Sequence, residues 1–355
     1  MNVIDFLKQA TELGVSDLFI VAGRPLSCKK DGRIMTFGED RVMPAQTDSL
    51  IREIYQLASG RDISHFLRKG DDDFSFAVPG LARFRISAYM QRGSMAAVIR
   101  VISFELPDAS ALNIPEQVIG LGNLSHGLVL VSGPAGNGKS MTLACIIDAI
   151  NRTYEKHIIT LEDPLEFLHS HKKSIVSQRE ISTDTKSYVA ALRAALRQSP
   201  DVILLGEMRD LETIAIAMTA AETGHLVLST LHTQGAANTI DRIIDVFPPD
   251  QQRQIAVQLS TVLQAVVSQQ LIPTADQTGL VPAFEMMTVT PAIRNMIREN
   301  KIHQIDGLIA SSVSETMFSM DFSLQKLYSR GMISAQDALA RASNTEMLKR
   351  KLQLK

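Results

Sequence analysis

The chain contains little cysteine, with Cys28 and Cys145 as the only two among its 355 residues. The two lie far apart, form no Cys-x-x-Cys motif and have no histidine at a spacing typical of zinc ligands. Neither a disulfide framework nor a structural metal site is therefore expected. We expect both thiols to be packed inside a protein of a reducing compartment.

Long hydrophobic runs and a strong net charge are missing as well. No stretch approaches 18 uninterrupted apolar residues, and the nearest candidate, 214–231, contains Glu222 and His225. The first residues lack the basic start and apolar core of a signal peptide. A net charge of −2 gives no indication of a nucleic-acid partner or an anionic membrane surface. We predict a cytoplasmic protein that reaches a membrane only through its partners.

Short helix and strand patterns alternate over the first hundred residues. Segment 83–90 has the period of a β-strand, with one face formed by Phe84, Ile86, Ala88 and Met90. Segment 96–102 is expected to pair with it across a turn at Gly93. We predict a small α+β domain over residues 1–104, followed by a linker over 105–112, where the periodicity lapses.

The remainder, residues 113–355, is predicted to be an α/β domain. Helical patterns separate apolar segments that are predicted to be strands, at 127–132, 157–161, 202–207, 226–230 and 281–286. This alternation indicates a mostly parallel sheet with helices on both faces. After Pro291 the pattern is helical to the end of the chain.

One octapeptide carries a phosphate-binding pattern, Gly-x-x-x-x-Gly-Lys-Ser. It consists of Gly133, Pro134, Ala135, Gly136, Asn137, Gly138, Lys139 and Ser140. A predicted strand precedes it and a predicted helix follows, so backbone N–H groups and a helix N-terminus point at one place and favour a polyphosphate. Lys139 is expected to reach the β- and γ-phosphates, and the Ser140 hydroxyl to bind Mg²⁺. The alternative, a chance match, is disfavoured by this context.

Hydrolysis also needs carboxylates, and the first candidate is Glu207. It ends the apolar segment 202–207, directly after Gly206, where many nucleotide hydrolases have the aspartate that orients Mg²⁺. We therefore expect Glu207 itself to serve the metal, partly through water. The alternative is an acid that caps the next helix, a role that Asp210 could fill equally well.

Glu162 and Asp163 form the second acidic candidate, at the end of the predicted strand 157–161 and before Pro164. As a general base, Glu162 would contribute a factor of about 10²–10⁴ to the rate. Asp163 would order the loop. A solvated turn is the alternative.

Two histidines bracket a further predicted strand, His225 before it and His232 after it. A histidine beside an apolar strand is usually structural, and that is the alternative here. His232 follows a strand expected to neighbour the P-loop strand, where a γ-phosphate sensor would lie, and we expect His225 to contribute to nucleotide binding.

Together these motifs resemble the secretion ATPases of the type II/type IV pilus superfamily, and within it the PilT/PilU branch of retraction motors. The octapeptide is similar to their Walker A motif, and four further stretches match their Asp box, atypical Walker B motif, His box and a helix of the retraction branch, at 161–166, 203–212, 219–233 and 292–299. The branch-specific helix is the most discriminating stretch. The resemblance covers nearly the whole chain.

The resemblance implies a homo-hexamer of PAS-like N-terminal domains and RecA-like P-loop ATPase domains, with ATP and Mg²⁺ held between the two domains. Glu162 then matches the catalytic glutamate and Glu207 the Mg²⁺-linked acid. Arginines of the N-terminal domain would reach the phosphates, with Arg85 and Arg100 as the best matches and Arg92 after them. For Arg85 a solvated strand face is the alternative.

Two positions depart from the pattern of this branch, Asn137 where serine is usual and Met141 where threonine or serine is common. We expect altered nucleotide turnover, because Gly138, Lys139 and Ser140 are intact.

The implied function is that of a motor that hydrolyses ATP to retract pili through an inner-membrane platform protein, with a paralogous pilus ATPase as a further partner. The C-terminal tail is similar to that of the accessory retraction paralogue, which leaves open which of the two motors this is. An extension or type II secretion motor is disfavoured, because the tetracysteine module and the additional N-terminal domain of such motors are missing. A non-hydrolysing regulator of another motor is disfavoured by the intact acids at Glu162 and Glu207. A nucleic-acid translocase is weaker, since no basic, aromatic-laced patch supports it.

Overall fold

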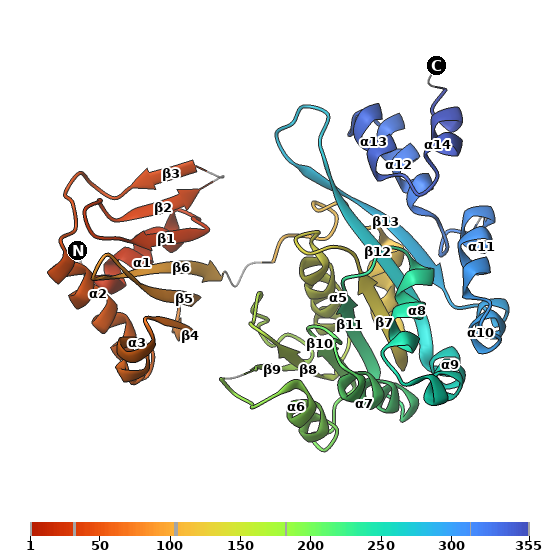
Figure 1. Ribbon diagram of the computed structural model, residues 1–355, viewed down its shortest axis with the longest axis horizontal. Helices are drawn as coiled ribbons and strands as arrows, with labels where there is room; N and C mark the ends of the chain where they lie inside the picture. The colour runs from red at the N-terminus through yellow and green to blue at the C-terminus, as the bar shows by residue number, and fades with distance from the viewer. Residues whose placement is uncertain (1, 31–32, 103–105, 182, 313, 354–355) are drawn as a thin grey trace. The chain divides into compact units, whose positions relative to one another are not determined.

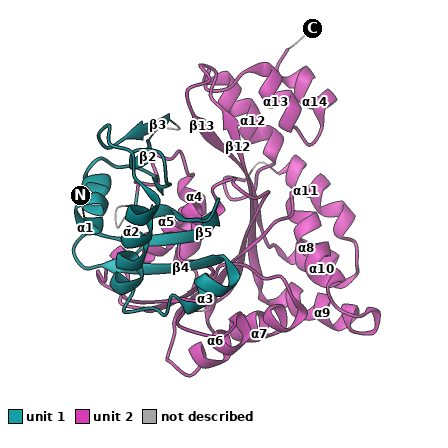
Figure 2. Ribbon diagram, turned by 60° about the vertical axis from the view of Figure 1, so that its left-hand side comes forward, with its two compact units in different colours: residues 1–106, 166–168 teal, residues 107–165, 169–355 magenta. Residues whose placement is uncertain are grey.

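The computed structural model describes residues 2–30, 33–102, 106–181, 183–312 and 314–353. The chain divides into two compact units (Figure 2): unit 1 comprises residues 1–106 and 166–168, and unit 2 residues 107–165 and 169–355. The predicted domain end at 104 and linker start at 105 fall outside the described residues. Within the described ranges, no helix is long and apolar enough to cross a membrane.

Unit 1 is an antiparallel sheet packed against helices (Figure 1), with the strand order β3-β2-β1-β6-β5-β4. The strands are β1 (Asp17–Ile20), β2 (Ser27–Lys30), β3 (Arg33–Thr36), β4 (Asp71–Val78), β5 (Ala82–Gln91) and β6 (Ser94–Ile102). The helices are α1 (Val3–Glu12), α2 (Pro44–Leu57) and α3 (Ser64–Lys69). Apolar side chains from all three helices and from the sheet form one core.

The predicted hairpin of β5 and β6 is confirmed, with the turn at Arg92 and Gly93. On β5 the side chains of Phe84, Ile86 and Ala88 are buried, as the period of two predicts. Met90, on the same face, is 44% exposed because it lies beside the hairpin turn, at the end of the strand.

Unit 2 contains a sheet with the strand order β13-β12-β7-β11-β10-β8-β9. Its neighbouring strands run parallel except for β12 and β13. The strands are β7 (Gly127–Ser132), β8 (His157–Glu162), β9 (Ile175–Glu180), β10 (Val202–Leu205), β11 (Leu226–Leu231), β12 (Leu263–Pro273) and β13 (Leu280–Thr288). The predicted, mostly parallel sheet is confirmed.

Helices cover both faces of this sheet, because alternate residues of each buried strand supply two different cores. On β7, Leu128 and Leu130 pack into the first core, while Val129 and Val131 pack into the second. The first core is completed by α6 (Tyr188–Ala195), α7 (Leu211–Glu222), α8 (Ala236–Asp245), α9 (Pro249–Val262), α10 (Pro291–Arg298) and α11 (Ile305–Ser311). The second is completed by α4 (Glu116–Ile119), the 3₁₀ turn η1 (Gly120–Asn123) and α5 (Lys139–Thr153).

The chain after β13 is helical, as predicted. A 3₁₀ turn, η2 (Ile302–Gln304), precedes α11, and the last helices are α12 (Met320–Ser329), α13 (Ala335–Arg341) and α14 (Thr345–Lys351). These last helices share an apolar cluster with the far ends of β12 and β13 through Ile272, Val281 and Ala283. The two cysteines are free and buried, so the prediction of packed thiols is confirmed.

In unit 2 the strand predictions differ from the structure in two respects. The strand expected over 202–207 ends at Leu205, so Gly206 and Glu207 belong to the loop after β10. Strands β9 and β12 were not expected. The first is a polar edge strand, and the second follows α9 without a turn, with a buried polar segment at Ser268, Gln269 and Gln270.

Candidate active site

The predicted P-loop joins the buried strand β7 to the 15-residue helix α5. Gly133 has a φ of +141°, and a Cβ built on it would lie 2.3 Å from the Gln269 carbonyl oxygen of β12. No other residue fits so close an approach of two backbones. Ala135 and Gly136 are exposed at the top of the loop. The loop therefore exposes its tip to solvent and leads directly into the N-terminus of α5.

Lys139 is 7% exposed, and its ammonium lies inside this loop. Nζ donates to the carbonyl oxygens of Gly133 at 2.7 Å and Pro134 at 3.0 Å. An ammonium held by its own loop, at the N-terminus of a long helix, forms a cradle for polyphosphate. The residues present thus fit the expected nucleotide. Ser140 and Met141 occupy the first turn of α5, where Met141 also packs against the second core.

His232, just after β11, connects Lys139 to Glu207. Its Nδ1 is 3.4 Å from Lys139 Nζ, and its Nε2 is 3.2 Å from Glu207 Oε2. These partners assign the neutral tautomer that donates from Nε2 to the carboxylate and accepts at Nδ1 from the ammonium. The other oxygen of Glu207 pairs with Arg209 at 2.7 Å. The capping alternative for Glu207 is wrong, since Asp210 caps α7 through a bond from the Thr213 N–H.

Glu162 is the last residue of β8, and the Gly206 backbone lies directly beside it. A Cβ on Gly206 would be 3.5 Å from the Glu162 Cα, and the Gly206 N–H donates to the Leu161 carbonyl at 2.8 Å. Glu162 Oε1 accepts from Gln178 Nε2 of β9 at 3.5 Å. Because β7, β11, β10 and β8 are parallel neighbours, their carboxyl ends bring the P-loop, His232, Glu207 and Glu162 to one edge of the sheet.

Tyr188, the first residue of α6, belongs to this edge and was missed in the sequence. Its hydroxyl oxygen lies 2.8 Å from the position of a Cβ on Gly206. The pKa of the phenol is raised, first by burial and then by the charges of Asp163, Glu207 and Glu162. A tyrosine at the start of a helix belongs to no motif. The one available signal in the sequence was Gly206, whose missing side chain leaves room for another group.

Gln269 of β12 is a second residue that the sequence did not indicate. Its Oε1 accepts a bond of 2.7 Å from the Thr142 hydroxyl in the first turn of α5, and both side chains are buried. Nothing in the spacing of the chain connects positions 142 and 269, because the contact depends on the unexpected strand β12.

His225 is a predicted site residue of unit 2 that the fold does not bring to this edge. It precedes β11, at the amino end of the strand, and its Nδ1 lies 2.9 Å from the Ala220 carbonyl. His232 follows the carboxyl end of the same strand, so the length of β11 separates the two histidines. We withdraw His225 from the nucleotide site of this chain and assign it a structural contact at the end of α7.

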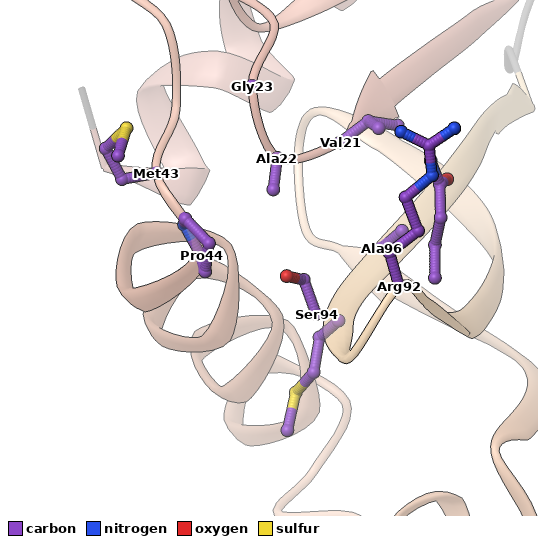
Figure 3. Close-up of a pocket in the computed structure, with 10 residues that line it drawn as sticks. Val21, Ala22, Gly23, Met43, Pro44, Arg92, Ser94 and Ala96 are labelled. Carbon is purple, nitrogen blue, oxygen red and sulfur yellow. The ribbon is translucent and has the colours of Figure 1, made fainter.

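The predicted arginines lie in unit 1. Arg85 and Arg100 are directly opposite each other on β5 and β6, and Arg100 Nε pairs with Asp17 at 3.1 Å. Arg92 lies at the hairpin turn, with a φ of +50°, and lines a small pocket of about 270 Å³, with Met43 on the opposite side (Figure 3). Their contribution to nucleotide binding stays a prediction.

A Mg²⁺ ion would be held here by few protein groups. Within the described part of the chain, no cluster of three or more His, Cys, Asp or Glu side chains is arranged to hold a metal. Mg²⁺ in nucleotide sites is commonly bound by one or two protein oxygens together with phosphates and water. Ser140 and Glu207 fit this pattern.

Comparisons with known proteins agree with this chemistry. Residues 7–306 match the family described as Type II/IV secretion system protein. The chain is 44% identical to the type IV pilus retraction ATPase PilT of Pseudomonas aeruginosa over 98% of this chain and 99% of that protein. It is 39% identical to the type IV pilus ATPase PilU of the same organism, over 100% and 92%. A crystal structure of the pilus retraction motor PilT with bound ADP superimposes with a TM-score of 0.89, at 45% identity and 99% coverage of both chains.

Three observations indicate an ATPase: the P-loop, the acids at the neighbouring strand ends, and the match along the whole chain. Unit 2 is a RecA-like P-loop ATPase domain, and unit 1 is the smaller N-terminal α+β domain that accompanies it. The protein belongs to the type II/IV secretion system protein family and is an ATPase of the PilT/PilU branch.

Proposed function

We propose that this protein is a hexameric motor that hydrolyses ATP to retract type IV pilus filaments and thereby supports twitching motility. The observation that carries the proposal is the single sheet edge at which Lys139, His232, Glu207 and Glu162 meet. Similarity to a retraction ATPase over nearly the whole chain supports the direction of the work.

In this proposal each residue of the edge has one task. Lys139 binds the β- and γ-phosphates, and Glu162 accepts the proton of the attacking water. His232, held between Lys139 and Glu207, senses the γ-phosphate through these two neighbours. Asp163 orders the loop after β8. Ser140 and Glu207 would hold Mg²⁺, which neutralises the charge that develops on the phosphates when it is bound.

Work would come from closure between the two domains. Arg85 and Arg100, with Arg92 in support, would reach the phosphates from the N-terminal domain while ATP is present, and hydrolysis would release them. Six copies of the 39.0 kDa chain would form the ring. The ring would act in the cytoplasm on a platform protein of the inner membrane, and a paralogous pilus ATPase is a further partner.

Deleting the gene in its host tests the direction of the work. A cell that has lost its retraction motor should carry excess surface pili and fail to twitch. A cell without pili would instead identify an extension motor and overturn the proposal.

A second candidate is the accessory role of a PilU-type paralogue, favoured by 39% identity along the whole of this chain. Complementation separates the two. In a strain that lacks every paralogous retraction ATPase, this chain alone should restore twitching if it is the principal motor. Restoration only in the presence of a paralogue would assign it the accessory role.

A further inference from the structure

Asn137, within the P-loop, makes a contact that reaches outside the loop. Its Oδ1 accepts a bond of 2.7 Å from the backbone N–H of Leu271 on β12. The register pairs β12 with β7 only from Leu263 to Ser268, so β7 supplies no backbone carbonyl to the Leu271 amide. The Asn137 side chain takes the place of that strand partner.

The same side chain also bonds within the loop. Its Nδ2 lies 3.3 Å from the carbonyl oxygens of Pro134 and Ala135. The Pro134 carbonyl in turn accepts from Lys139 Nζ at 3.0 Å. One amide therefore joins β12 to a carbonyl that holds the phosphate-binding ammonium.

The neighbouring contacts make β12 a firm support. Gln269, two residues before Leu271, accepts from Thr142 in the first turn of α5, and its carbonyl abuts Gly133. One residue beyond Leu271, the fully buried Ile272 packs against the C-terminal helices. β12 thus holds the start of the loop, the start of α5 and, through Asn137, the turn between them.

We propose that Asn137 is a positioning residue of the nucleotide site, which fixes the P-loop to β12 and orders the carbonyls that hold Lys139. The proposal concerns the ATPase site itself and does not depend on whether the motor retracts or extends pili. Serine at this position would be too short to reach both β12 and the loop carbonyls. Aspartate would keep the acceptor for Leu271 but lose the donor to the loop.

Hydrogen exchange of the full-length protein without nucleotide tests the first contact. In Asn137→Ser the Leu271 amide should exchange about fivefold faster, as expected for the loss of one hydrogen bond. In Asn137→Asp its protection should remain. Asn295→Ser, the same change at an exposed position of α10, is the matched control and should leave the amide unchanged.

Titration with MgADP alone tests the consequence for the site. Both Asn137→Ser and Asn137→Asp should bind ADP about fivefold or more weakly than the wild type and Asn295→Ser. Unchanged exchange at Leu271 in Asn137→Ser would overturn the contact. Faster exchange with unchanged ADP affinity would show that Asn137 only supports β12, and would overturn its positioning role.

Discussion

Gly206 precedes the Walker B glutamate at a place where many nucleotide hydrolases have an acid, and the structure gives a steric reason for the glycine. The hydroxyl of Tyr188 occupies the space that a side chain would need, 2.8 Å from the Cβ position. Burial and the charges of Asp163, Glu207 and Glu162 raise the pKa of this phenol. The hydroxyl of Tyr188 therefore fills the space where other sites place a carboxylate.

Gly206→Ala should consequently lower both stability and ATP turnover. The added methyl must displace Tyr188 or the loop, at a cost of about 1–3 kcal/mol in the free energy of unfolding. Gly206→Ala/Tyr188→Phe should recover most of that loss, because the hydroxyl is the group in the way. Urea unfolding of both variants measures this.

Gly307→Ala is the matched control, since nothing lies within 4 Å of its Cβ position in α11. It should be neutral or slightly stabilising. If Gly206→Ala were as stable as this control, the steric account of the glycine would be wrong.

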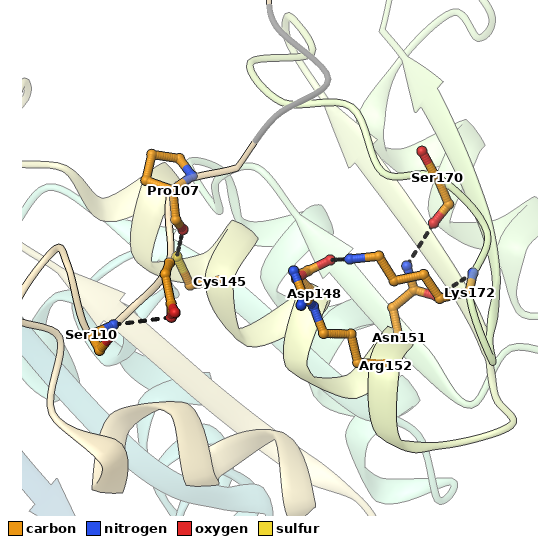
Figure 4. Close-up of polar contacts among 9 residues, drawn as sticks. Pro107, Ser110, Cys145, Asp148, Asn151, Arg152, Ser170 and Lys172 are labelled. Atoms are coloured by element: carbon orange, nitrogen blue, oxygen red, sulfur yellow. Dashed lines mark hydrogen bonds and ion pairs between the residues drawn. The ribbon is translucent and has the colours of Figure 1, made fainter.

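Helix α5 anchors flanking segments as well as carrying the P-loop (Figure 4). Asp148 pairs with Arg152 at 2.6 Å and with Lys172, and the buried Asn151 bonds to the backbone of Ser170 and Lys172. Nearer its start, the Cys145 thiol donates to the Pro107 carbonyl at 3.8 Å. The helix that begins at the P-loop therefore also fixes the segment before β9.

Replacing Asp148 by asparagine should destabilise the fold in a pH-dependent way. Burial acts to raise the pKa of Asp148, but bonds from Lys172 and Arg152 outweigh it, and the pKa is lowered from the ordinary 3.8. A lowered pKa stabilises the fold above the ordinary value, and this stabilisation is lost as the pH falls through the folded pKa. Both cations are partly exposed, so at pH 7 the free energy of unfolding of the wild type should exceed that of Asp148→Asn by no more than about 1 kcal/mol.

Chemical denaturation from pH 7 to pH 2 checks this. The gap between wild type and Asp148→Asn should stay constant down to about pH 4 and then close. A gap independent of pH would exclude the ion pairs as its cause.

Helix α10 contains the stretch similar to the retraction branch. Within this stretch, Arg294 contacts the C-terminal end of α9. Its guanidinium donates to the carbonyls of Ser260 and Thr261, in the last turn of α9, at 2.6 and 2.7 Å. A cation at the C-terminus of a helix satisfies open carbonyls and interacts well with the helix dipole.

Arg294→Ala should therefore cost about 1–3 kcal/mol in the free energy of unfolding. Arg294→Lys should recover part of this, because lysine keeps the charge but not the forked geometry. Arg298→Ala, an exposed arginine of the same helix, is the control. Equal stability of the Arg294→Ala and Arg298→Ala variants in urea would refute the capping role.

For the molecule as a whole, the sequence predicted helices and strands well wherever the pattern of apolar residues was clear. The strand before Gly133 is a continuous apolar run and the helix after Ser140 has helical apolar spacing, and the fold class followed from the alternation of such segments. Strand β12 was missed because Ser268, Gln269 and Gln270 are buried among sheet neighbours that only the folded chain provides. Because β12 was not predicted, the contacts of Gln269 and Leu271 with the P-loop could not be predicted either.

The site shows the same limit. Lys139 was predicted in the loop after one strand, and Glu162, Glu207 and His232 at the ends of three others; parallel strands bring such ends together. His225 was grouped with them because a motif does not distinguish the two ends of a strand. Tyr188 was missed because its relation to Gly206 is steric and joins two distant segments.

The Glu162→Gln variant tests whether these residues form one hydrolytic site in which Glu162 is the base. ATP turnover and MgADP binding of the purified variant are compared with those of the wild type. Turnover should fall by a factor of about 10²–10⁴, with nucleotide still bound. Wild-type turnover in Glu162→Gln would show that Glu162 is not the base.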